Sequence, residues 1–319
     1  MFYLGIDLGG TNIVAGVVDD NFNIIAKGKV KTNSPRPAEQ IVDDMAQAAK
    51  IAMDNAGLKI SDIKYCGVGS PGSIDAETGT VLTANNLKFD MVPLKQMLES
   101  RLNCSVFVAN DANAAAFGEM LAGAGRGTSN FVAITLGTGV GGGVIIDNKI
   151  LTGCNGAGGE LGHTVIVVDG EQCSCGRKGC WEAYASATAL VRQTKEAMLN
   201  NQDSGLWELV GGKLDKVSGR TSFDGMRNGD KIAKAVVDNY VKYVAVGLVN
   251  MVNIFQPEVI CIGGGISNEG ETLIGPIREI LSQQDYAKNN KKSVVLKTAQ
   301  LGNDAGVIGA AFLGELYCK

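Results

Sequence analysis

The chain has 319 residues, of which 45% are hydrophobic and 19% are charged, and its formal net charge is -4. A chain of this length can bury two ordinary cores without disulfide bonds. Its slight acidity gives no diffuse basic field, which argues against sequence-independent binding to nucleic acid or to an anionic membrane, so small molecules are the expected partners.

Two glycine turns, each set between strand-like runs, indicate an internal duplication. The first copy runs from Tyr3 to Asp19 and the second from Phe131 to Asp147. Equivalent positions match in residue type, namely Ile6 with Ile134, Leu8 with Leu136, Gly9 with Gly137 and Asp19 with Asp147. A repeat of this kind predicts two domains of one design.

Helix and strand signals alternate around these hairpins, which is typical of a mixed sheet with helices on its faces. We expect helices over residues 37–56, 112–121, 181–199, 231–255 and 304–316, with another starting near 269, and strands over 64–69, 105–109, 258–262 and 293–298. The stretch 200–230 gives no clear signal. The expected class is α/β, with a small domain over 1–120 that the helix at about 304–319 rejoins, and a large domain over 121–303.

The only histidine, His163, stands ten residues before three clustered thiols, Cys173, Cys175 and Cys180. Three thiolates and one imidazole are a standard donor set for tetrahedral zinc. The alternatives are a buried histidine and a disulfide in a secreted domain, but the glycines between the thiols suit a tight turn around an ion. The pattern favours a zinc site.

The remaining cysteines are scattered along the chain, as in proteins of the reducing cytoplasm. Asp7 interrupts the first apolar run too early for a signal peptide. The longest uncharged stretch, residues 127–146, is too polar for a membrane helix. We therefore expect a cytoplasmic protein without a membrane span.

Residues 137–142 satisfy the dinucleotide-binding pattern G-x-G-x-x-G. That loop must open a helix, whereas the β-branched run Val144-Ile145-Ile146 resumes a strand here, which argues against a dehydrogenase. A glycine turn inside a hairpin still presents backbone N–H groups to a phosphate chain. If the two halves face each other, both turns would grip the β- and γ-phosphates, and Asp7 would hold Mg²⁺ through water. The chain has no P-loop sequence.

Asn110-Asp111-Ala112-Asn113 follows the strand expected at 105–109, at the carboxyl end where open α/β sheets bind ligands. Phosphoryl transfer asks the protein for positioning, charge neutralisation and a base for the attacking hydroxyl. Asp111 can be that base. Equally, Asn110 or Asp111 can be a helix cap, and the residues alone do not separate these alternatives.

Five motifs together resemble the ROK family of bacterial sugar kinases and related repressors, over essentially the whole chain. They are Asp7-Leu8-Gly9-Gly10-Thr11-Asn12, Asn110-Asp111-Ala112-Asn113, Leu136-Gly137-Thr138-Gly139-Val140-Gly141, Gly159-Glu160-Leu161-Gly162-His163 and Cys173-x-Cys175-Gly176-x-x-Gly179-Cys180-x-Glu182. The resemblance implies the actin-like, hexokinase-like ATPase fold, with two ribonuclease H-like halves, an interdomain cleft, and ATP and Mg²⁺ as cofactors.

The resemblance also implies roles for single residues. Asp111 would be the general base that accepts the proton of the sugar 6-hydroxyl. The other hydroxyls would be bound by Asn110, Glu160, His163 and Glu182, completed by Gly72 and Asn85 or Asn86. The nucleotide would be bound by Asp7, Gly9, Gly10, Thr11, Asn12, Gly137, Thr138 and Gly139, with Gly263, Gly264 and Gly265 against the adenosine. Zinc would be structural and would also orient His163 toward the sugar.

The expected function is ATP-dependent phosphorylation of glucose to glucose 6-phosphate. Alternatives are a kinase for N-acetylmannosamine, fructose or allose, and a non-catalytic sugar-sensing regulator. Family repressors carry an added amino-terminal helix-turn-helix, whereas this sequence starts at the first phosphate strand, which favours the kinase. Phe89 stands where many family glucokinases have Trp, which leaves the preferred hexose open, and polyphosphate-using relatives lack the cysteine cluster. We expect a homodimer or homotetramer.

Overall fold

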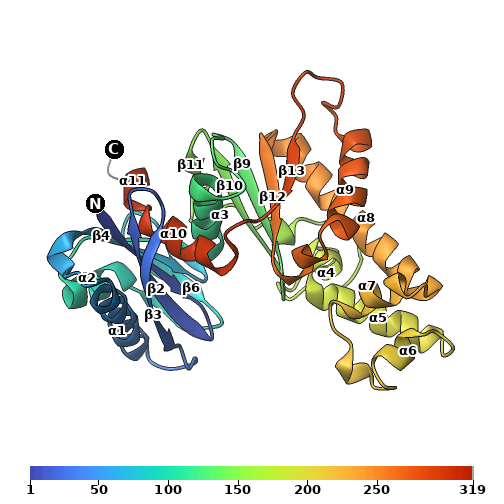
Figure 1. Cartoon of the computed structure of the whole chain (residues 1–319), viewed down its shortest axis with the longest axis horizontal. Coiled ribbons are helices and arrows are strands. Elements are labelled where there is room, and N and C mark those ends of the chain that lie inside the picture. Colours follow the sequence, from blue (N-terminus) through green and yellow to red (C-terminus); the bar gives the residue numbers. More distant parts are fainter. Residues whose placement is uncertain (318–319) are drawn as a thin grey trace. The chain divides into compact units, whose positions relative to one another are not determined.

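The computed structural model describes residues 1–317, so Cys318 and the end of the helix expected at about 304–319 lie outside the described residues. Two five-stranded sheets organise the fold (Figure 1), with the strand orders β3-β2-β1-β4-β8 and β11-β10-β9-β12-β13. In both sheets the first three strands in chain order form a run at one edge, and the fourth and fifth strands follow beside the first. The duplicated α/β design expected from the two glycine turns is therefore confirmed.

The first sheet consists of β1 (Phe2–Leu8), β2 (Asn12–Asp19), β3 (Ile24–Lys31), β4 (Ile63–Ser70) and β8 (Val106–Asn110). The second consists of β9 (Phe131–Leu136), β10 (Val140–Ile146), β11 (Lys149–Ile150), β12 (Val259–Gly263) and β13 (Val295–Thr298). β1 pairs antiparallel with β2 and parallel with β4, and β12 pairs parallel with β13. A third, small sheet contains β5 (Ser73–Asp75), β6 (Thr80–Ala84) and β7 (Phe89–Val92).

The α-helices of the described residues are α1 (Ala38–Ala56), α2 (Leu94–Leu102), α3 (Asp111–Ala122), α4 (Glu182–Ala185), α5 (Ala187–Asn200), α6 (Leu206–Leu209), α7 (Thr221–Arg227), α8 (Lys231–Phe255), α9 (Glu271–Gln284), α10 (Ala305–Ala311) and α11 (Gly314–Tyr317). Short 3-10 turns lie at Ile60–Asp62, Leu161–His163, Leu214–Lys216, Gly265–Glu269 and Gly302–Asp304. None of the helices described is both long and apolar enough to cross a membrane.

The chain divides into two compact units. The first comprises residues 1–131, 143–159 and the segment from 300 onward, and the second comprises 132–142 and 160–299. Relative to the boundaries expected from the sequence, residues 121–131 and 143–159 lie in the first unit instead of the large domain. The hairpin of β9 and β10 therefore contributes residues to both units.

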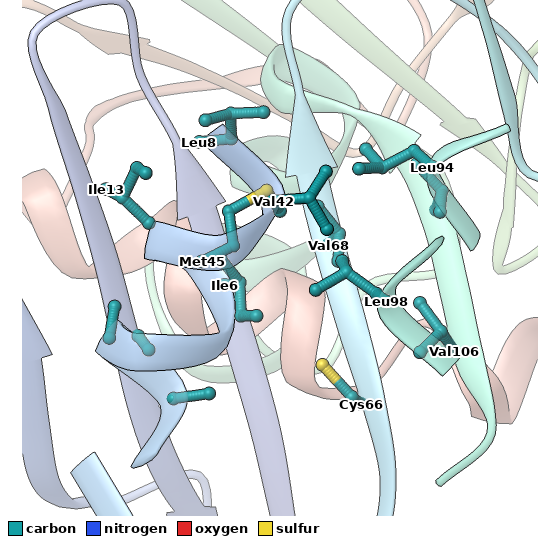
Figure 2. Packing of buried hydrophobic residues seen from close by; sticks show 14 of the residues in the cluster. Ile6, Leu8, Ile13, Val42, Met45, Cys66, Val68, Leu94, Leu98 and Val106 are labelled. Atoms are coloured by element: carbon teal, nitrogen blue, oxygen red, sulfur yellow. The ribbon is translucent and has the colours of Figure 1, made fainter. Parts of the chain in front are cut away.

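In the first unit, α1 and α2 pack on the sheet through a core of aliphatic side chains (Figure 2). Ile6 of β1, Met45 of α1 and Leu98 of α2 all belong to this core and are fully buried. The apolar positions of α1 recur every three or four residues, which gives the helix one buried face. The helix ends at Gly57, whose φ of 68° is the left-handed conformation that glycine adopts readily.

Helix α10 packs against β1, β4 and α3, also within the first unit. A Cβ at Gly67 of β4 would lie 1.8 Å from the carbonyl oxygen of Ala310, so only glycine lets the helix backbone come this close to the strand. The buried Glu119 of α3 accepts hydrogen bonds from the backbone N–H groups of Gln300 (2.9 Å) and Leu301 (2.7 Å). Its carboxylate thereby fixes the chain where it re-enters this unit.

Trp181 and α8 organise part of the second unit. The Trp181 side chain is fully buried, its indole N–H donates to the carbonyl of Tyr243 at 2.8 Å, and a Cβ at Gly247 would lie 2.0 Å from its ring. The prediction of a single helix over 181–199 is wrong in one respect, because Ser186 divides this segment into α4 and α5. This residue is extended (ψ 162°), and its hydroxyl caps α5 by accepting from the N–H of Ala189.

Candidate active site

The residues singled out from the sequence form two groups, one in each unit. The first unit contains Asp7, the glycine turn that follows β1, Gly72, the two asparagines at 85 and 86, Asn110 and Asp111. The second unit contains the glycine turn that follows β9, the triglycine at 263–265, Glu160, Glu182 and the residues of the proposed metal site.

The turn at Gly9, Gly10 and Thr11, here called the β1 turn, closes the hairpin of β1 and β2. The N–H of Gly9 donates to the carbonyl of Asn12 at 3.0 Å. Thr32, the residue after β3, donates its hydroxyl to the Gly9 carbonyl at 2.6 Å and its N–H to the Thr11 carbonyl at 3.0 Å. The turn is thus held by the neighbouring strand, while Gly10 and Thr11 remain exposed.

Asn110 and Asp111 lie where β8 passes into α3, and the structure separates their functions. The side-chain oxygen of Asn110 caps α3 by accepting from the N–H groups of Ala112 (2.9 Å) and Asn113 (3.2 Å). Its amide nitrogen donates to the carbonyl of Gly72 at 3.0 Å, which brings two of the expected sugar ligands together. The cap is therefore Asn110, and Asp111 is the first residue of the helix, where its Oδ1 accepts from the N–H of Ala112 at 2.9 Å.

Asn85 and Asn86 lie in the exposed loop between β6 and β7. The carbonyl of Asn86 accepts a hydrogen bond from the Ser34 hydroxyl at 2.7 Å. A Cβ at Gly10 would lie 3.6 Å from the side-chain nitrogen of Asn86. Asn86 is therefore next to the β1 turn.

Asp7 and Asp111 influence each other electrostatically. Burial, together with the negative charge of Asp111, raises the pKa of Asp7 to about 6. The start of α10 adds to this burial, since a Cβ at Gly306 would lie 2.9 Å from the Asp7 carboxyl group. The raised pKa of Asp7 and the nearby negative charge of Asp111 favour a bound cation or a proton at this place.

The turn at residues 137–140, here called the β9 turn, is the second copy of the β1 turn. The N–H of Gly137 donates to the carbonyl of Gly139 at 3.0 Å. The start of α5 supports the turn, because the N–H of Ala187 and the hydroxyl of Thr188 each donate at 2.8 Å, to the carbonyls of Gly137 and Thr138 respectively. The turn opens into β10 and not into a helix, which confirms that the G-x-G-x-x-G pattern is not a Rossmann loop here.

The triglycine at 263–265 ends β12, the neighbour of β9. Gly264 has a φ of 87°, and a Cβ there would lie 2.4 Å from the carbonyl oxygen of Leu136, the last residue of β9. The triglycine and the β9 turn therefore leave the same edge of the second sheet. This places two of the expected nucleotide-binding segments next to each other.

His163, Cys173, Cys175 and Cys180, here called the Cys-His cluster, come together in the second unit. Their ligand atoms all lie within 4.8 Å of one another. The Cys173 sulfur is 3.6 Å from His163 Nδ1, and the sulfurs of Cys175 and Cys180 are 3.7 Å apart. This sulfur separation is too long for a disulfide and close to the edge of about 3.8 Å of a tetrahedron with zinc–sulfur bonds of about 2.3 Å. The cluster can therefore hold a metal ion, and its donor set fits zinc.

Two tight turns allow the thiols to converge. The N–H of Cys173 donates to the carbonyl of Arg177 at 2.8 Å, and Gly176 returns its N–H to the carbonyl of Cys173 at 3.1 Å. Gly176 (φ 88°) and Gly179 (φ 77°) adopt left-handed conformations, and a Cβ at Gly179 would lie 1.7 Å from the carbonyl of Val167. These glycines make the spacing of the thiols possible.

Glu160 and Glu182 differ in their surroundings. Glu160 is exposed, and its carbonyl begins the 3-10 turn of His163 by accepting from that residue's N–H at 3.1 Å. The carboxylate of Glu182 accepts from the Val140 N–H at 3.0 Å through Oε2 and from the Ser174 hydroxyl at 2.9 Å through Oε1. Sequence reasoning did not anticipate these two contacts, because no local pattern links residue 140 or 174 to Glu182.

Comparison with known proteins supports this picture. A family model described as the ROK family matches residues 3–315. A glucokinase from Streptomyces coelicolor is 39% identical over 318 residues, which cover 98% of this chain and 97% of that protein. A glucokinase from Thermotoga maritima is also 39% identical, over 310 residues that cover 97% of this chain and 95% of that protein.

Among solved structures, a ROK family glucokinase from Streptomyces griseus in complex with glucose and AMPPNP is 39% identical to this chain. It has a TM-score of 0.80, and the match covers 98% of this chain and 99% of that one. This likeness confirms the hexokinase-like fold expected from the motifs. With the family model matching nearly the whole sequence, the chain belongs to the ROK family.

Proposed function

We propose that the chain transfers the γ-phosphoryl group of ATP to the 6-hydroxyl of glucose, giving glucose 6-phosphate and ADP. The observation that carries the proposal is the carboxylate of Asp111 at the junction of β8 and α3, beside a helix cap that Asn110 already supplies. The relative solved with glucose and AMPPNP supports the choice of sugar and nucleotide.

Asp111 is the general base of this proposal. A carboxylate has about four acceptor positions, so the bond from the Ala112 N–H does not exhaust its capacity to take a proton. Asp111 accepts the proton of the sugar 6-hydroxyl as the oxygen attacks the γ-phosphorus. The bond between that phosphorus and the β–γ bridging oxygen breaks, and ADP leaves.

In the proposal, the sugar is bound by Gly72 and Asn110, with Asn85 or Asn86, and by Glu160, His163 and Glu182. Carboxylates and amides recognise a neutral polyol because they accept and donate hydrogen bonds in fixed directions. Losing one partner leaves a buried polar group unpaired, at a cost of about 1–3 kcal/mol.

The two glycine turns bind the phosphates, in the proposal at Gly9, Gly10, Thr11, Asn12, Gly137, Thr138 and Gly139. The N–H groups of Gly9 and Gly137 bond within their own turns, so these two glycines serve the shape of the turns. The triglycine at 263–265 lies against the adenosine. Asp7 would hold Mg²⁺, and its raised pKa and its proximity to a second carboxylate suit a hard cation with oxygen ligands. The ion would neutralise phosphate charge during transfer.

Zinc is the metal proposed for the Cys-His cluster, because a convergent set of three sulfurs and one imidazole nitrogen matches its preference. It would be structural. With Nδ1 of His163 facing the Cys173 sulfur, Nε2 is the ring atom left to donate to a sugar hydroxyl. The metal would therefore set the direction of that bond.

A hexose panel tests the proposal. ADP release from MgATP is measured with glucose, N-acetylmannosamine, fructose and allose on purified protein, and zinc is determined on the same sample. We expect the highest kcat/KM with glucose. Efficient turnover of another hexose with little on glucose rejects the glucose assignment, and no turnover on any sugar rejects the kinase.

A further inference from the structure

The carboxylate of Glu182 connects the Cys-His cluster to the β9 turn. One oxygen, Oε2, accepts the N–H of Val140 at 3.0 Å, and a Cβ at Gly139 would lie only 2.3 Å from the same oxygen. Glycine at 139 therefore leaves the space that this carboxylate needs. The conformation of the turn and the position of Glu182 depend on each other.

The other oxygen, Oε1, is held from the Cys-His cluster side. Ser174 donates its hydroxyl to it at 2.9 Å, and the Cys173 sulfur lies 3.7 Å from it. The Ser174 hydroxyl is the shorter of these two contacts to Oε1.

Ser174 stands between two of the metal-ligating residues but offers no ligand itself. Its backbone position is fixed by the cluster, since the flanking Cys173 and Cys175 both belong to it. A loaded cluster would therefore fix the backbone from which the Ser174 hydroxyl reaches Glu182. The chain of contacts runs from the cluster through Ser174 and Glu182 to the N–H of Val140.

We propose that Ser174 is a positioning residue that fixes Glu182 and, through it, holds the β9 turn in the conformation that binds the triphosphate of ATP. The inference deepens the proposed function and rests on its assignment of the β9 turn to the phosphates. It gives the Cys-His cluster a second effect, on nucleotide binding, besides its effect on the sugar through His163.

The test compares Ser174→Ala with Ser174→Thr, which keeps a hydroxyl at the same position. The Kd of AMPPNP is measured by calorimetry without sugar, KM for ATP and kcat by ADP release, and zinc per chain on every sample. We expect Ser174→Ala to raise the Kd and KM about 3- to 10-fold with kcat within about twofold, since a hydrogen bond to a charged group is lost at a partly exposed site. Ser174→Thr should restore both values to within about twofold of the wild type.

Ser282→Ala is the matched control. It also removes a serine hydroxyl, one that donates to the carbonyl of Glu279 within α9. It should leave all values unchanged. The inference is overturned if Ser174→Ala binds AMPPNP with the wild-type Kd, or if Ser174→Thr weakens AMPPNP binding as much as Ser174→Ala does. It is also overturned if zinc is lost in proportion to the weaker binding. If the wild type binds AMPPNP but phosphorylates no glucose, the proposed function fails, and the Kd comparison still decides the role of Ser174.

Discussion

The β1 turn and the β9 turn occupy equivalent places in the duplicated topology, but they are held in different ways. The β1 turn is tied by Thr32, which follows the next strand of the same sheet. The β9 turn is tied by Glu182, Ala187 and Thr188, which lie some forty to fifty residues further along the chain. Duplication preserved the hairpin, while the support of each turn comes from residues particular to that copy.

This difference has a functional meaning under the proposed mechanism. The group of residues in the first unit places a base, Asp111, on a helix that begins directly after a buried strand. The group in the second unit depends on a segment whose thiols and histidine converge in an arrangement that can hold a metal ion. Damage to the first group should therefore affect chemistry, whereas damage to the second should affect metal, stability and substrate binding together.

The largest effect is expected for Asp111→Asn. Removing the base should lower kcat by about 10²- to 10⁴-fold with a small change in KM. The melting temperature should stay close to that of the wild type, because Asn110 provides the helix cap. Steady-state kinetics and thermal denaturation check this, and a variant that keeps its kcat would remove Asp111 from the mechanism and favour a non-catalytic regulator.

A smaller effect on catalysis, with a larger one on stability, is expected when the Cys-His cluster is broken. Cys175→Ser should lower the zinc content well below one ion per chain and lower the melting temperature, because metal binding contributes to folding. His163→Gln should raise the KM for glucose even in molecules that keep zinc. Equal folding defects with an unchanged KM would contradict the double role of His163.

The last effect is on stability alone, concerns Asp7 and depends on pH. Because its pKa is raised from 3.8 to about 6 in the folded protein, the favourable neutral form is lost as pH rises through about 6. Asp7→Asn should therefore be more stable than the wild type above pH 6, by on the order of 3 kcal/mol without Mg²⁺, and equal to it below about pH 4. Melting temperatures from pH 4 to 8 measure the gap, and a constant gap across that range would contradict the assigned cause.

Elements with strong periodicity were predictable from the sequence. The helix expected over 231–255 matches α8, and the helix expected over 37–56 differs from α1 by one residue. The break at Ser186 was missed because the apolar pattern continues through it. The helix expected over 304–316 is divided into α10 and α11, and no feature of the apolar pattern indicated that division. Strands as short as those of the third sheet carry too few residues for a recognisable alternation.

The site was predictable to the extent that its residues are local in the chain. The ligands of the Cys-His cluster follow a spacing that a sequence shows directly, and the structure brings their atoms together. The choice of cap between Asn110 and Asp111 needed backbone geometry, which sets Asn110 outside the helix. The bonds of Glu182 to Ser174 and Val140 depend on how three segments pack, which no local pattern records.

The position of α10 has a consequence for biosynthesis. This helix covers β1 and β4, yet its residues leave the ribosome after the whole second unit has been made. Until then Gly67 lacks the backbone of α10 that packs directly against it. The first unit therefore begins folding early and is completed last, so a growing chain that stalls after residue 299 exposes an apolar sheet face that chaperones would have to shield.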